Sequence, residues 1–170
     1  MKTTLQRIVV SSLFAALVCV ATMIIKIPSP LKGYINLGDC IILLSAFLLP
    51  IGYGFLAAGI GSALADIFSG YVAYAPATFV IKGLMAVVFF VILKLSSKKI
   101  KSTPARLLSG ICAELTMILG YFLFEGFLYG FAPSLVNIPA NGVQGIAGLI
   151  LGSILISIFE KQNLKKLLKR

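Results

Sequence analysis

Long apolar runs separated by short polar breaks are the feature that most constrains how this chain can fold. The runs are candidate helices over residues 5–27, 39–49, 53–71, 77–95, 105–129 and 139–159. A helix needs about 20 apolar residues to cross the hydrocarbon core of a bilayer, and every run except the second is of that order. With 59% hydrophobic and only 12% charged residues, the chain is predicted to be all-α, a polytopic membrane protein with a single six-helix domain over residues 1–170.

The run at 39–49 is short for a crossing helix, so the distribution of positive charge has to decide whether it crosses. Basic residues concentrate in the cytoplasmic segments of membrane proteins. Here they cluster near the N-terminus, between the fourth and fifth runs, and at the C-terminus: Lys2, Arg7; Lys94, Lys98, Lys99, Lys101, Arg106; Lys161, Lys165, Lys166, Lys169 and Arg170. The first two clusters share a side only if an even number of crossings separates them. The sequence therefore predicts that 39–49 crosses, after a loop that dips into the membrane, and that both termini are cytoplasmic.

Several function classes are disfavoured by what the sequence lacks. The chain has no histidine, which removes imidazole zinc sites and Ser-His-Asp catalysis. It has no GxxxxGK[ST] loop for ATP hydrolysis, and its three cysteines have no regular spacing that would indicate a disulfide framework. The net charge of +10 lies at segment ends rather than on an aromatic-rich surface. We therefore expect the bilayer as a partner and no nucleic acid, metal or cofactor.

An aspartate and a lysine stand out inside the third and fourth runs. Ionisable groups within the membrane are functional candidates and need a partner. Asp66 and Lys82 each lie eight residues from Tyr74, at the tip of the turn between the two runs, so an antiparallel hairpin brings them to similar depth. We predict an Asp66–Lys82 pair with a structural role. The alternative is that Lys82 faces a binding cavity while Asp66 accepts hydrogen bonds from loop backbone.

The fifth and sixth runs carry further polar groups. Glu114 and Glu125 are eleven residues apart, about three helical turns, so they share a face with Tyr121. This stripe could bind a cationic or hydrogen-donating ligand, or it could hold helices together; we predict a ligand role for Glu125 and a structural role for Glu114. Asn141 and Gln144 are one turn apart at the mouth of the sixth run, and their amides suit a polar ligand.

The first run has a stripe of small residues at four-residue spacing, Ser11, Ala15 and Cys19. Small residues at this spacing allow another helix to approach closely. The stripe is either an internal helix contact or a docking face for a partner membrane protein, and the residues alone leave both interpretations open.

Four stretches, "IKIPSPLKGYINLGD", "PIGYGFLAAGIGSALADIFSGY", "YAPATFVIKGLMA" and "PANGVQGIAG", together make this chain similar to the substrate-binding S components of energy-coupling factor (ECF) vitamin transporters. The resemblance implies a six-helix subunit that captures a vitamin from outside with high affinity. It also implies docking on a transmembrane coupling protein that carries two cytoplasmic ATPases, and toppling in the cell membrane to deliver the vitamin. The docking face would be the stripe of the first run, where the usual Ala-xxx-Ala reads Ala15-xxx-Cys19. Carried over residue by residue, the binding site would comprise Tyr34, Asn36, Asp39, Lys82, Glu125, Asn141 and Gln144.

The same resemblance favours a small heterocycle as substrate, such as a vitamin B6 form or the hydroxymethyl-pyrimidine precursor of thiamine. Tyrosines and amides suit a small hydroxylated ring, Lys82 would tolerate an anion such as pantothenate, and the absence of tryptophan mildly disfavours a large flavin. Two other classes are weighed against this. An autonomous carrier or channel would transport without partners, and an intramembrane enzyme would use Asp66, Glu114 or Glu125 but has no recognisable nucleophile or metal set.

Overall fold

The computed structural model describes residues 3–31 and 33–162, so Lys2, Lys32 and the basic residues beyond 162 lie outside the described residues. The elements are α1 (Thr4–Ile24), β1 (Ile27–Pro28), β2 (Tyr34–Ile35), α2 (Gly38–Leu48), α3 (Ile51–Phe68), α4 (Ala75–Ser96), α5 (Ser102–Tyr129), α6 (Phe131–Ser134), a 3-10 turn (Leu135–Asn137) and α7 (Ile138–Lys161). The six predicted runs correspond to α1, α2, α3, α4, α5 and α7, with ends that differ by three residues or fewer.

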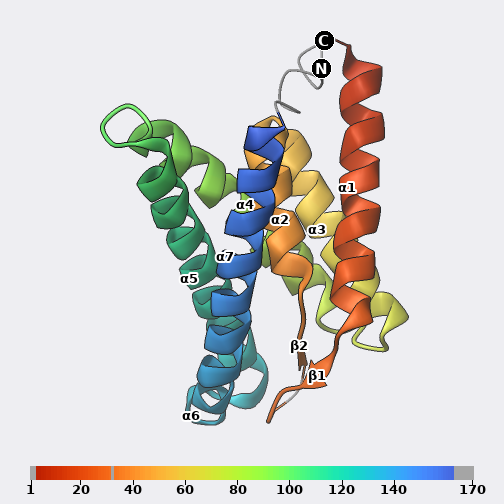
Figure 1. Cartoon of the computed structure of the whole chain (residues 1–170). Coiled ribbons are helices and arrows are strands. Elements are labelled where there is room, and N and C mark those ends of the chain that lie inside the picture. The colour runs from red at the N-terminus through yellow and green to blue at the C-terminus, as the bar shows by residue number, and fades with distance from the viewer. Residues whose placement is uncertain (1–2, 32, 163–170) are drawn as a thin grey trace.

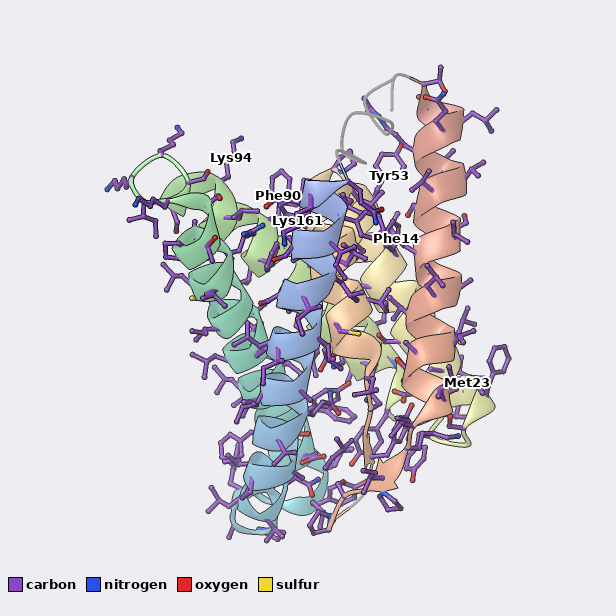
Figure 2. The ribbon with its side chains drawn as sticks, in the orientation of Figure 1. Phe14, Met23, Tyr53, Phe90, Lys94 and Lys161 are labelled. Atoms are coloured by element: carbon purple, nitrogen blue, oxygen red, sulfur yellow. The ribbon has the colours of Figure 1, made fainter. Side chains whose placement is uncertain are left out.

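The six longer helices run alternately up and down the bundle (Figure 1). The start of α1, the α4–α5 connection and the end of α7 lie together at one end, here called the basic end. Lys94 and Lys161 lie at this end, and Met23 lies near the other (Figure 2). The opposite end, here called the hairpin end, carries β1, β2, the α3–α4 turn and α6. This arrangement agrees with an even number of passes between the two basic clusters.

By length and composition, five segments are able to cross a membrane: α1, α3, α4, α5 and the stretch from Phe131 to Lys161. The remaining helix, α2, has eleven residues, of which nine are buried. It packs against α1, α3, α4 and α7. Because α2 is enclosed by protein rather than lipid, its length need not match the bilayer. The other helices carry many exposed leucine, isoleucine and valine side chains, as expected for surfaces that face lipid.

Proline and glycine set several of the helix ends. Pro50 immediately precedes α3, and α4 has a proline in its first turn, where the missing N–H costs nothing. Gly130 ends α5 with φ of +93°, a left-handed conformation that glycine adopts without a steric penalty. Thr3 and Gln6 form a reciprocal capping box at the start of α1. These local signals fix where α1, α3 and α4 begin and where α5 ends.

Close packing of α3 against its neighbours depends on its small residues. A Cβ at Gly59 would lie 2.7 Å from the backbone oxygen of Phe79 on α4, and one at Gly61 would overlap the α1 backbone at Ala15. Both glycines are therefore required for the observed helix spacing. The core around α2 is filled by large apolar side chains, among them Phe89, Ile42, Leu43, Met85 and Met117.

Candidate ligand site at the hairpin end

A small polar cavity lies between the hairpin and the ends of α3, α4, α5 and α7. Its walls are formed by Ser29, Gly33, Tyr34, Asn36, Asp66, Tyr71, Tyr74, Thr78, Tyr121, Glu125, Asn141 and Gln144. The cavity volume is about 30 Å³, enough for about one water molecule. The walls combine aromatic faces, amides and two carboxylates. No lysine or arginine is among the lining residues that the structure describes.

The hairpin, residues 27–35 with strands β1 and β2 paired antiparallel, is tied to the end of α3. The Tyr34 hydroxyl donates a hydrogen bond to Asp66 Oδ1 at 2.7 Å, and Lys26 Nζ donates to Ser69 Oγ at 3.1 Å. Burial, together with the neighbouring Asp66 carboxylate, raises the pKa of Tyr34. The Tyr34 hydroxyl therefore keeps its proton and remains a donor to Asp66.

The same hairpin is tied on its other side to α7. The backbone N–H and the side-chain amide of Asn36 both donate to Gln144 Oε1, at 3.0 and 3.1 Å. Asn36 Oδ1 in turn accepts the backbone N–H of Gly38 at the start of α2. Nearby, the N–H of Leu31 donates to Asn137 Oδ1 at 3.1 Å. Side chains of α3 and α7 thus hold the hairpin across the cavity mouth.

Lys82 forms a buried ion pair with Asp39, so the predicted Asp66–Lys82 pair is wrong. Asp39 is 0% and Lys82 2% exposed. The second carboxylate oxygen, Asp39 Oδ2, accepts the Gln144 amide at 2.7 Å, and the Lys82 ammonium lies 5.5 Å from the ring centroid of Tyr121. The physical reason is the direction in which the Lys82 side chain leaves α4. Asp66 and Lys82 lie at similar depth in the antiparallel pair α3 and α4, but the Lys82 side chain points toward Asp39 on α2. The pair lies beneath the cavity rather than in its wall.

Asp66 also differs from the alternative expectation, because its carboxylate is held by a hairpin side chain rather than by loop backbone. It lines the cavity and is joined to the hairpin through Tyr34. Its structural role stays a prediction.

Glu125 is buried in the cavity wall with one oxygen engaged and one not. Glu125 Oε1 accepts from Asn137 Nδ2 at 2.8 Å and from the Tyr74 hydroxyl at 3.4 Å. Glu125 Oε2 has no hydrogen-bond partner among the described residues. Since an ionised carboxylate oxygen only accepts, this oxygen is suited to a donor group on a ligand. Asn141 lines the cavity from α7 on the same side.

Five of the seven predicted binding residues line the cavity: Tyr34, Asn36, Glu125, Asn141 and Gln144. Asp39 and Lys82 do not, although both contact lining residues. Whether the five contact a ligand stays a prediction. Within residues 3–31 and 33–162, no group of three or more His, Cys, Asp or Glu side chains is placed to hold a metal ion.

The sequence did not single out part of the aromatic wall. The Tyr34 and Tyr71 ring centroids lie 5.0 Å apart, and those of Tyr71 and Tyr74 lie 6.3 Å apart. On the helices below, the hydroxyls of Thr78 and Tyr121 are 3.1 Å apart. One signal in the sequence could have indicated this wall. Tyrosine recurs in two of the connections at the hairpin end, "KGYI" and "GYVAYAP".

The small-residue stripe of α1 faces α3 over much of its length. Ser11 and Cys19 are buried, and Ser11 Oγ donates to the backbone oxygen of Tyr53 at 3.1 Å. Beside this contact, an apolar groove of about 390 Å³ opens between α1 and α3, with Ala15, Ile60 and Leu64 among its lining residues. The stripe therefore forms an internal helix contact, and its role in docking a partner stays a prediction.

Known proteins resemble this chain in both sequence and fold. The family model of the ECF-type riboflavin transporter S component matches residues 2–161. The chain belongs to this family. A protein of Pyrococcus woesei described as "Uncharacterized protein in gap 3'region" is 37% identical over 146 residues, which cover 85% of this chain and 95% of that protein. The solved structure described as "Structure and mechanism of the S component of a bacterial ECF transporter" superimposes with a TM-score of 0.70 and 25% identity, over 99% of this chain and all of that one.

The chain is thus a multi-pass membrane protein and the substrate-binding subunit of an ECF transporter. Proteins of this kind bind a small-molecule substrate and couple to an energising module that contains ATPases. This S component is a transport subunit and not an enzyme. The predicted resemblance to S components of ECF transporters is thereby confirmed.

Proposed function

We propose that this S component binds riboflavin with high affinity at the hairpin end and serves its uptake across the cell membrane. The observation that carries the proposal is the cavity of tyrosines, amides and carboxylates beneath the hairpin, in a chain whose family is described by riboflavin transport. The same family description outweighs the mild argument against a flavin from the absence of tryptophan.

The wall chemistry suits a flat, uncharged heterocycle that carries hydroxyl groups. Tyr34, Tyr71 and Tyr74 supply aromatic faces for stacking. The amides of Asn141 and Gln144 offer donors and acceptors to the imide edge of a flavin ring, and the free oxygen of Glu125 accepts from a hydroxyl or N–H. An anion such as pantothenate is disfavoured, because Lys82 is already paired with Asp39 and no lysine or arginine is among the described residues that line the cavity.

Riboflavin is far larger than a cavity of about 30 Å³, so its binding requires the hairpin to move outward. That movement breaks the contact of Tyr34 with Asp66 and the contacts of Asn36 with Gln144. The small cavity is also the observation that favours a second candidate, a vitamin B6 form or hydroxymethyl-pyrimidine, which needs less opening.

For delivery, we propose docking on a transmembrane coupling protein with two cytoplasmic ATPases, followed by toppling with the termini on the cytoplasmic side. The groove between α1 and α3 supports this, because it is apolar and lies beside Ser11 and Ala15. Cys19, the third residue of the stripe, is buried and is not among the described residues that line this groove.

The test is equilibrium binding of a vitamin panel to the purified chain, using quenching of riboflavin fluorescence and competition by pyridoxine, pyridoxal, hydroxymethyl-pyrimidine and pantothenate. We expect riboflavin to bind most tightly. Glu125→Gln should weaken binding about tenfold, the effect of losing about 1.4 kcal/mol. The matched control is Glu160→Gln, whose carboxylate pairs with Arg106 at the basic end, and it should leave affinity unchanged.

Three results would redirect the proposal. Tighter binding of a B6 form or hydroxymethyl-pyrimidine would select the second candidate. No binding of any vitamin by folded protein would refute the site. Transport by the chain alone in liposomes, without ATPase partners, would favour an autonomous carrier instead.

A further inference from the structure

Glu114 is a buried carboxyl that the cavity does not use. It lies near the middle of α5 and is 4% exposed. Neither of its oxygens has a hydrogen-bond partner among the described residues, and it is not among the residues that line the cavity at the hairpin end. An ionised carboxylate in such surroundings is expensive without a partner, and a native structure with one needs an explanation.

Two glycines of α7 provide the space that Glu114 occupies. A Cβ at Gly145 would lie 3.2 Å from Glu114 Cβ, and a Cβ at Gly148 would lie 2.8 Å from Glu114 Oε1 and also 2.8 Å from Asp39 Cβ. Glu114 and Asp39 therefore flank the same backbone position. Because even a methyl group does not fit there, the space suits a proton rather than a hydrated metal ion.

The charges around Glu114 do not balance if every group is ionised. The charged groups that act on it are Asp39 of α2 and Lys82 of α4, and the Cys40 thiol of α2 is a further titratable neighbour. On α7, no ionisable residue occurs between positions 138 and 159, and Gln144 is its polar contribution near Asp39. Two carboxyls thus share one ammonium, and Lys82 is already paired with Asp39.

We propose that Glu114 is a proton-binding site inside the membrane domain and that it is protonated in the described conformation. Its carboxyl is also the second one available to the Lys82 ammonium. With the proton in place, the cluster of Asp39, Lys82 and Glu114 has no net charge. Loss of the proton leaves a second carboxylate that competes with Asp39 for Lys82. The proton therefore favours the pairing of Lys82 with Asp39.

This site has a physical connection to the cavity, a consequence that rests on the proposed function. Asp39 Oδ2 accepts from Gln144 Nε2, and Gln144 Oε1 accepts from Asn36 after the hairpin. The amide of Gln144 is thereby held with its oxygen toward Asn36. A proton on Glu114 keeps Asp39 paired with Lys82, and Asp39 in turn fixes the orientation of the Gln144 amide in the cavity wall. Glu114 is therefore a positioning residue rather than a ligand contact.

The direct test is infrared spectroscopy of the purified, ligand-free chain in detergent. Wild-type protein should show a carboxylic-acid C=O band at neutral pH that shifts in deuterated buffer. Glu114→Gln should lower the intensity of this band, whereas Glu160→Gln, from the Arg106 pair, should leave it unchanged. A wild-type spectrum without the band, or a band of unchanged intensity in Glu114→Gln, overturns the proposal.

Thermal unfolding against pH gives a second readout. A glutamate in the unfolded chain has released its proton above about pH 5, so the folded chain holds the extra proton and its stability must fall as pH rises. We expect the melting temperature to fall from about pH 6 to 9 more steeply in wild type than in Glu114→Gln. Equal slopes in the two proteins contradict the proposal. So does stabilisation by sodium, relative to choline at equal ionic strength, that the variant lacks.

A double variant tests the second half of the proposal. Asp39→Asn leaves Lys82 with Glu114 as a remaining counterion, so we expect a modest loss of melting temperature. The combined Asp39→Asn and Glu114→Gln protein leaves the ammonium without a carboxylate and should lose more than the sum of the single changes. Additive losses would show that Glu114 does not serve Lys82. Because these experiments use no vitamin, their failure is distinct from failure of the proposed function.

Discussion

Replacing Lys82 by methionine is the most informative perturbation of the site. It removes the ammonium but keeps most of the apolar volume, and it leaves the Asp39 carboxylate 0% exposed with the Gln144 amide as its remaining side-chain partner. Removing one member of a buried ion pair costs about 3–5 kcal/mol. A typical domain is stable by only about 5–15 kcal/mol, so Lys82→Met should unfold at much lower temperature than wild type.

The double-variant cycle identifies the partner of Lys82. Asp39→Asn in the Lys82→Met background removes the stranded charge, and the double variant should recover part of the loss, with a coupling energy of about 0.5–3 kcal/mol. Asp66→Asn in the same background should add to the loss instead, because Asp66 is bound by Tyr34 and not by Lys82.

Unfolding can be followed with a thiol-reactive dye, since Cys19 and Cys40 are buried and free and become reactive when the bundle opens. Lys94→Met is the control, because Lys94 is exposed at the basic end, and surface changes of this kind usually alter stability by about 0.5 kcal/mol or less. Additive losses for Asp39 and Lys82, or non-additive losses for Asp66 and Lys82, would refute the pairing described here.

Two further predictions concern the hairpin and the α7 glycines. Tyr34→Phe removes a hydrogen bond to a carboxylate, worth about 1.5–3 kcal/mol, and should raise amide hydrogen exchange in residues 27–35 about tenfold or more; unchanged exchange would mean that this bond does not hold the hairpin closed. Gly148→Ala introduces a methyl group 2.8 Å from Asp39 and Glu114 atoms and should cost about 1–3 kcal/mol of stability from overpacking. Gly142→Ala has no atom within 4 Å of the added Cβ and is the matched control by thermal unfolding, where equal losses in both variants would contradict the close approach.

The order and extent of the helices were predictable because the bilayer restricts a chain of this composition to a few solutions. The six apolar runs correspond to six helices with nearly the predicted ends, and the basic clusters predicted that these helices alternate in direction. The burial of α2 was not predictable from its own residues, since a short apolar run reads the same whether lipid or protein surrounds it. The two-residue strands β1 and β2 were also missed, because a pairing of that length has no periodicity to detect.

Predicting side-chain partners failed where predicting depth succeeded. The eight-residue spacings of Asp66 and Lys82 from Tyr74 fix how far each lies from the turn, but a helix also has a rotational setting about its axis, and successive residues differ by about 100°. That setting directs Lys82 toward Asp39 on α2, a residue 43 positions away in the chain. The acid that pairs with Lys82 therefore lies on α2, the helix whose burial was not predictable from its own residues.

The rotational setting also decides which polar residues act together. With Lys82 on Asp39, Asp66 is free to accept from Tyr34 and hold the hairpin, while Gln144 joins Asp39 to Asn36. Had Lys82 paired with Asp66 instead, the buried Asp39 carboxylate would have lost the counterion that it has in the structure. One ion pair beneath the cavity thus permits two separate attachments of the hairpin above it, on α3 and on α7. Under the proposed function, entry of riboflavin breaks both attachments, whereas the ion pair beneath the cavity stays intact.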